Sequence, residues 1–161
     1  YGAFSSHDDV QAMLWLKNNT PANTRVLNHP GPHEGDWVPV IAERDSVYFR
    51  PQPFFRGDED ALAEQERLRA FWEDPADSAN ATLLEAAGIG YVIVPQILTN
   101  PESALTQFRW APPFTDTIEA RSSVADAPYL ELVFDANGAQ VYEFKGAGTS
   151  SASDETALAP V

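Results

Sequence analysis

The 161-residue chain contains no cysteine, which excludes disulfide frameworks, thiolate zinc sites and thiol-based catalysis. It also lacks any apolar run of the roughly 18 residues that a membrane-spanning helix needs. Cations are scarce, because 10 Lys and Arg residues stand against 24 Asp and Glu residues and the net charge is −14. Such a field repels polyanions, so we expect neither nucleic-acid binding nor association with an anionic membrane surface.

What the chain does have is the composition of one folded domain. Apolar residues make up 43% and aromatic residues 11% of it, as in globular proteins. We expect a single domain over residues 1–145. From 146 to 161 the sequence turns to Gly, Ala, Ser, Thr and Pro without aromatic residues, which predicts a disordered tail. Because the chain begins at Tyr1 without a Met, we interpret it as a piece of a longer polypeptide or as a processed product.

The hydrophobic pattern predicts alternating helices and strands. A capping signal, Ser6-His7-Asp8-Asp9, opens a first helix that ends before Pro21. Two further helices are expected, the second with Asp77 or Ser78 as its cap and Gly88 as its stop. A short helix is expected to begin at Asn100. The helices are predicted at 7–18, 58–74 and 78–87, and the strands at 25–28, 47–49, 91–94, 130–134 and 140–144.

The order of these elements predicts an α/β sandwich of two or three layers. The early strands are expected to be parallel, and the apolar, β-branched run 91–94 is typical of a strand buried on both faces. Asn137-Gly138 between the last two strands is a strong signal for a hairpin. We therefore predict a mainly parallel sheet with a C-terminal antiparallel hairpin at one edge.

One cluster has the residue types of a metal site: His29, His33, Glu34 and Asp36. A His-x-x-x-His spacing brings both imidazoles to one metal only on a helix, and the Pro-Gly-Pro between them forbids that geometry. A loop folded around an ion would be the alternative. We favour a polar surface loop of turn-forming residues, and we expect no metal and no cofactor.

Other motifs carry little chemical information. No G-x-S-x-G elbow surrounds a serine, and the glycines at 88 and 90 precede a strand instead of a helix, unlike a dinucleotide fingerprint. Two triplets match the N-glycosylation acceptor pattern, Asn18-Asn19-Thr20 and Asn80-Ala81-Thr82, and chance matches are common. Arginines interleave with aromatic residues between Trp37 and Arg56, which suits either core packing or stacking on sugars. Whether the chain is an enzyme is left open.

Three segments carry a family resemblance. They are WLKNNTPANTRVL at 15–27, LLEAAGIGYVIVP at 83–95 and LELVFDANGAQVYEFK at 130–145, together with Trp37 and Arg44 between the first two. This arrangement resembles the soluble C-terminal domains of GT-C-type glycosyltransferases, such as oligosaccharyltransferases and mannosyltransferases, and of related polytopic bacterial membrane proteins. The resemblance implies an extracytoplasmic α/β domain attached to a membrane-spanning portion of the same polypeptide.

The resemblance stops short of an activity. In oligosaccharyltransferases the corresponding helix and strand lead to a W-W-D-Y-G motif that helps to recognise the acceptor peptide. Here residues 29–37 read HPGPHEGDW, so acceptor recognition is not carried over. The family's catalytic acids lie in its membrane portion, which implies that this chain has no complete active site.

The resemblance thus implies a non-catalytic accessory domain that shapes acceptor or partner access at the extracytoplasmic face of a bacterial membrane. Its partners would be the membrane-spanning portion and a glycan or polypeptide acceptor. A loop surface after the first strand, where α/β sheets bind ligands, is the predicted binding site: His29, His33, Glu34, Asp36, Trp37 and Arg44. The alternatives are a self-contained metal-dependent hydrolase built on the 29–36 loop, or a small sugar-binding module.

Overall fold

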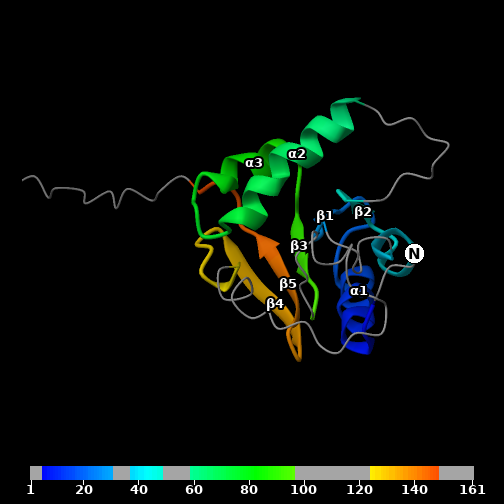
Figure 1. Ribbon diagram of the computed structural model, residues 1–161. Coiled ribbons are helices and arrows are strands. Elements are labelled where there is room, and N and C mark those ends of the chain that lie inside the picture. Colours follow the sequence, from blue (N-terminus) through cyan, green and yellow to red (C-terminus); the bar gives the residue numbers. More distant parts are fainter. Residues whose placement is uncertain (1–4, 31–36, 49–58, 97–123, 149–161) are drawn as a thin grey trace, which may run out of the picture.

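The computed structural model describes residues 5–30, 37–48, 59–96 and 124–148. Figure 1 shows its helices and strands in chain order. They are α1 (His7–Asn19), β1 (Arg25–Leu27), the π-helix η2 (Val38–Ala42), β2 (Asp45–Ser46), α2 (Glu59–Glu73), α3 (Asn80–Ala86), β3 (Tyr91–Val94), β4 (Leu130–Ala136) and β5 (Ala139–Phe144). The helix expected from Asn100 and the tail beyond 148 lie outside the described residues. Within the described ranges, no helix is long and apolar enough to cross a membrane.

The five strands form one mixed sheet in the order β2-β1-β3-β5-β4. β1 pairs in parallel with β2 and β3, while β5 is antiparallel to both β3 and β4. Four of the five strands therefore run in the same direction. The predicted mainly parallel sheet with a C-terminal hairpin at its edge is confirmed.

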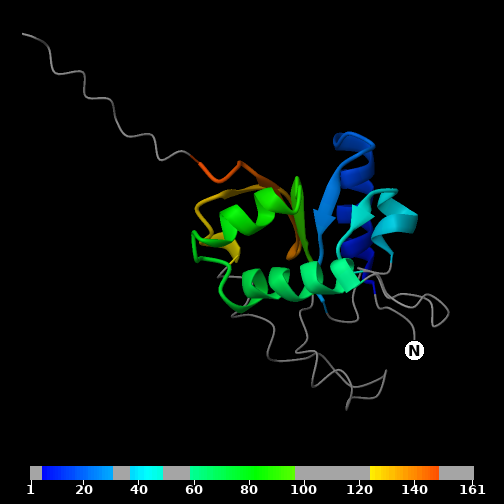
Figure 2. The same cartoon turned by 90° about the horizontal axis from the view of Figure 1, so that it is seen from above.

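The sheet is covered on both faces, which makes three layers (Figures 1 and 2). Neighbouring strand residues point to opposite faces, and Val26 and Leu27 of β1 accordingly enter different cores. On the α1 and η2 side the buried apolar residues are Ala12, Met13, Leu16, Val26, Val38, Ala42, Ile93, Ala139 and Val141. On the α2 and α3 side they include Leu27, Val47, Leu68, Phe71, Leu84, Val92, Val94 and Tyr142.

Helix α1 begins with a complete capping box. The Ser6 hydroxyl accepts from the Asp9 amide at 3.0 Å, and the Asp9 carboxylate accepts from the Ser6 amide at 2.9 Å. Asp9 thus performs the role for which Glu or Gln is preferred. Helix α1 ends at Asn19, one residue after the predicted end.

Several sequence-based boundaries were displaced, and two of them show the reason. The second strand is Asp45–Ser46, and it begins two residues before the predicted start at Val47, because Arg25 and Val26 pair with polar Asp45 and Ser46. Helix α3 begins at Asn80 after Ala79, and not directly after Asp77 or Ser78. Asp77 still acts as a local acceptor, since its carboxylate bonds the Ala79 amide at 2.9 Å. The hydrophobic pattern predicted where these elements lie in the chain, but hydrogen bonding determined the residues at which they begin.

The turns match their sequence signals. Gly88 ends α3 with φ of +68°, a left-handed conformation that glycine adopts without steric cost. Asn137 and Gly138 both have positive φ, +52° and +96°, as a two-residue hairpin turn of type I′ requires. The predicted hairpin is therefore confirmed in its turn as well as in its strands.

Candidate functional site at the carboxyl end of the parallel strands

The carboxyl end of β1 is organised by Asn28, whose side chain is fully buried. Its Nδ2 donates to the Tyr48 carbonyl at 2.7 Å, and its Oδ1 accepts from the Tyr48 amide at 2.8 Å. The carboxamide thus imitates the backbone of a neighbouring strand and extends the β1–β2 pairing beyond Ser46. Both polar atoms of Asn28 are engaged, so the residue holds the chain at this edge.

His29 follows Asn28 and lies against helix α2. It is 9% exposed, and its ring meets the Trp72 indole edge to face, with centroids 4.9 Å apart and planes at 71°. The Trp72 Nε1 donates to the Asn28 carbonyl at 3.1 Å. An indole that packs by its ring and donates by its N–H fixes neighbours in both ways. His29 is therefore held between β1 and α2.

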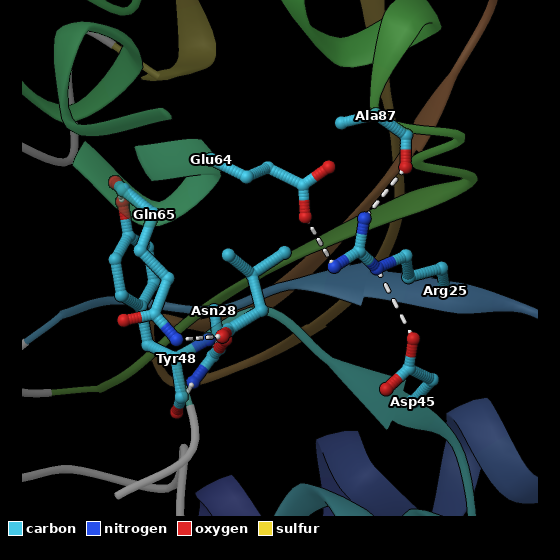
Figure 3. Close-up of polar contacts among 8 residues, drawn as sticks. Arg25, Asn28, Asp45, Tyr48, Glu64, Gln65 and Ala87 are labelled. Atoms are coloured by element: carbon cyan, nitrogen blue, oxygen red, sulfur yellow. Dashed lines mark hydrogen bonds and ion pairs between the residues drawn. The ribbon is translucent and has the colours of Figure 1, made fainter. Parts of the chain in front are cut away.

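Tyr48 connects the end of β2 to the same helix. Its hydroxyl donates to the Gln65 carbonyl at 2.7 Å, and Gln65 Nε2 donates back to the Val47 carbonyl at 3.0 Å. Figure 3 shows these residues side by side with Asn28. Burial raises the pKa of Tyr48 well above its ordinary value, because the charged phenolate is disfavoured away from water. At neutral pH Tyr48 is a hydrogen-bond donor and not a base.

The end of β3 is held by the start of α1. The backbone N–H of Gln96 donates to Asp9 Oδ1 at 2.7 Å, and the side-chain Nε2 of Gln96 donates to Asp8 Oδ2 at 2.9 Å. Asn137 in the hairpin turn reaches the same Asp8 oxygen at 3.3 Å. The amino end of α1, the end of β3 and the β4–β5 turn therefore meet at one edge of the sheet.

The opposite edge, at the amino ends of the parallel strands, is ionic. Arg25 lies between α2, α3 and β2 (Figure 3). Its Nη2 lies 2.6 Å from Glu64 Oε1 and its Nη1 donates to the Ala87 carbonyl at 2.8 Å. Its Nε lies 3.1 Å from Asp45 Oδ2, an ion pair whose geometry is not that of a hydrogen bond. The hydrogen bond to Glu64 is the main factor that raises the pKa of Arg25.

Arg44 lies at this amino end too, immediately before β2. It is 8% exposed, and it donates to oxygens at the end of α1 and next to β2. The acceptors are Thr20 Oγ1 and the carbonyls of Lys17, Thr20, Ala42 and Glu43, at 2.7–3.3 Å. Helix ends leave carbonyls without intrahelical partners. Arg44 satisfies two carbonyls at the end of α1, those of Lys17 and of the cap residue Thr20.

The structure therefore separates the predicted site residues that it describes. His29 follows β1 at the carboxyl end, whereas Arg44 precedes the parallel β2 at the amino end. Trp37 is the cap residue directly before η2 and is 40% exposed. His33, Glu34 and Asp36 lie outside the described residues. A common site for all six stays a prediction.

Sequence reasoning missed the residues that surround His29: Asn28, Tyr48, Gln65 and Trp72. Trp72 lies within the helix predicted at 58–74, and only its position beside Asn28 shows its role. A buried-looking Asn directly after a strand was the available signal, because side-chain amides at strand ends commonly bond a neighbouring backbone. Among the described residues, no three metal-ligating side chains gather in one place.

Comparison with known proteins gives a structural likeness. No protein-family model matches the chain, and no curated protein matches it. Among solved structures, it is similar to the C-terminal globular domain of an oligosaccharyltransferase from Archaeoglobus fulgidus. The TM-score is 0.56 at 16% sequence identity, over 88% of this chain and 99% of that chain. At this identity the similarity shows a common fold, extending over nearly the whole of the archaeal domain.

Proposed function

We propose that this chain is a non-catalytic accessory domain of a membrane glycosyltransferase-like protein of GT-C type. It would lie at the extracytoplasmic face of a bacterial membrane and shape the access of an acceptor or partner. The observation that carries the proposal is the fold similarity to a domain of an oligosaccharyltransferase, which covers 99% of that domain. The independent sequence resemblance at 15–27, 83–95 and 130–145 supports it, because these segments form α1–β1, α3–β3 and the hairpin.

The geometry of the carboxyl end supports an accessory role. The polar side-chain groups around His29 form hydrogen bonds with backbone atoms of neighbouring residues. These groups belong to Asn28, Tyr48, Gln65 and Trp72. Groups that are hydrogen-bonded in this way can hold the start of the loop after β1 in place. A general base, in contrast, needs a free lone pair and a pKa near neutrality. We therefore propose that His29 anchors the loop that follows β1, and that His33, Glu34, Asp36 and Trp37 contact the acceptor or partner.

The membrane context is tested on the native polypeptide. Antibodies against residues 1–161 would locate the chain in fractionated cells, and protease added to intact cells would test its exposure. We expect a membrane-bound polypeptide longer than 17.7 kDa whose chain segment is cleaved from outside. A free polypeptide of that mass in the cytoplasm would refute the proposal.

The accessory role is tested by measuring glycosyl transfer by the parent protein and by the isolated chain. In the parent protein, deletion of the chain or replacement of residues 33–36 by Gly and Ser should lower glycosyl transfer, while the purified chain alone should transfer nothing. The matched control replaces the exposed Glu59 and Asp60 at the start of α2, far along the chain from the loop. Transfer by the isolated chain, or an undiminished parent after deletion, would contradict the role.

A further inference from the structure

Two acceptor triplets for N-linked glycans lie within the described residues, and the fold treats them differently. Asn80, in the first triplet position at the start of α3, is 4% exposed. Its Nδ2, the atom to which a glycan would be joined, donates to the Asp74 carbonyl at 2.8 Å. A sugar on this nitrogen would have no room, because the residue is buried and its Nδ2 already contacts the Asp74 carbonyl. A chain that received a glycan at Asn80 before folding could therefore not adopt this structure.

Asn18 lies in the last turn of α1 and is exposed, as are its neighbours Lys17 and Asn19. The last turn of α1 ends at Thr20, whose backbone is already extended. Carbohydrate attached to Asn18 Nδ2 would project from the surface without displacing a core residue. The core face of this helix consists of Ala12, Met13 and Leu16, so Asn18 can carry a bulky group and the helix can still pack.

The third residue of this triplet is held by the fold. The Thr20 hydroxyl donates to the Leu16 carbonyl at 2.5 Å and accepts from Arg44 Nε at 2.9 Å. The acceptor pattern requires a hydroxyl residue at this position. A transferase that reads the hydroxyl therefore needs the last turn of α1 to be open, as it is before the chain has folded.

We propose that Asn18 is an N-glycosylation site, modified before the last turn of α1 closes onto Arg44, and that the folded protein carries no glycan at Asn80. The donor is a lipid-linked diphosphate oligosaccharide. A bond forms between Asn18 Nδ2 and C1 of the first sugar, the bond from C1 to the diphosphate oxygen breaks, the lipid diphosphate leaves, and one amide proton passes to a base of the transferase. Modification in the native cell rests on the proposed extracytoplasmic location, because the machinery acts there.

The test is secretion of the full chain, behind a signal peptide, from yeast cells. Peptide mass spectrometry after endoglycosidase treatment gives the occupancy of each asparagine. We expect one glycan, at Asn18, in the wild type, and its complete loss in Asn18→Gln. Asn19→Gln is the matched control, because it changes a neighbouring exposed amide and keeps the triplet, and it should retain the glycan.

Two results would overturn the proposal: a glycan on Asn80 of the secreted, folded protein, or an unmodified Asn18 in both the wild type and Asn19→Gln. The timing has its own test. With a purified transferase, a peptide of residues 14–24 should be modified at least about ten-fold faster than the folded, unmodified chain, since only locally opened molecules present the hydroxyl. Equal rates would refute the timing. Because the yeast pathway supplies the compartment, failure here is separate from failure of the membrane proposal.

Discussion

Replacement of Arg44 tests whether one buried guanidinium joins α1 to the edge of the sheet. Its five hydrogen bonds reach Thr20 Oγ1 and four backbone carbonyls, and the residue is 8% exposed. In Arg44→Met these oxygens lose their donors in a buried setting, whereas Arg44→Lys keeps the charge but loses the planar fork of donors.

The expected magnitudes follow from this geometry. A buried acceptor left without its donor costs about 1–3 kcal/mol, and a cation at a helix carboxyl end contributes about 0.3–1 kcal/mol. The Met side chain fills part of the space, so we expect Arg44→Met to lower the free energy of unfolding by about 3–4 kcal/mol. Arg44→Lys can restore only some of the bonds, and we expect a loss of about 2 kcal/mol.

The assay is urea unfolding followed by far-UV circular dichroism, in which a change of midpoint at constant slope reports stability. For a chain of this size the Met variant should also lower the Tm by about 10 °C. The matched control is Arg69→Met, which breaks an exposed pair with Glu66 and should cost less than about 0.5 kcal/mol. If both Arg44 variants unfold like the wild type, the reasoning is wrong, and a binding role for Arg44 gains support.

Three further predictions concern charge, titration and backbone. With a net charge of −14, the chain repels itself, so raising NaCl from about 0.05 M to about 1 M should increase the urea midpoint; a lower midpoint would contradict this. Burial raises the pKa of Tyr129 to about 12, so its stabilising effect is complete below the unfolded pKa near 10 and is lost as the pH rises through the folded value. Unfolding midpoints at about pH 9 and pH 11 should therefore differ less in Tyr129→Phe than in the wild type, and an unchanged difference would count against the assignment. Gly88→Ala should cost about 1 kcal/mol from its φ of +68° alone, because no atom lies within 4 Å of the added Cβ. Gly148→Ala is equally unobstructed and has no positive φ, so it should leave the free energy of unfolding unchanged. Thermal unfolding of both variants measures the difference.

Local sequence patterns predicted the elements and, through their order, the parallel pairing of the early strands and the antiparallel hairpin. Capping at Ser6, the break at Pro21, the β-branched run at 91–94 and the Asn137-Gly138 turn each act within a few residues of the chain. Those interactions predict α1, β1, β3 and the hairpin. The sequence left open whether the sandwich has two or three layers, because periodicity does not say which face of a sheet a helix covers.

Tertiary structure decided what the polar residues do. Asn28 and Tyr48 are 20 residues apart, Arg44 and Thr20 are 24 apart, and Asn28 and Trp72 are 44 apart; no local pattern predicts such contacts. Arg44 was expected on the loop surface that follows the first strand, whereas the structure directs donors of its guanidinium to the end of α1. The number of chain segments that meet at one edge depends on long-range packing, and the roles of Asn28, His29 and Arg44 follow from that packing.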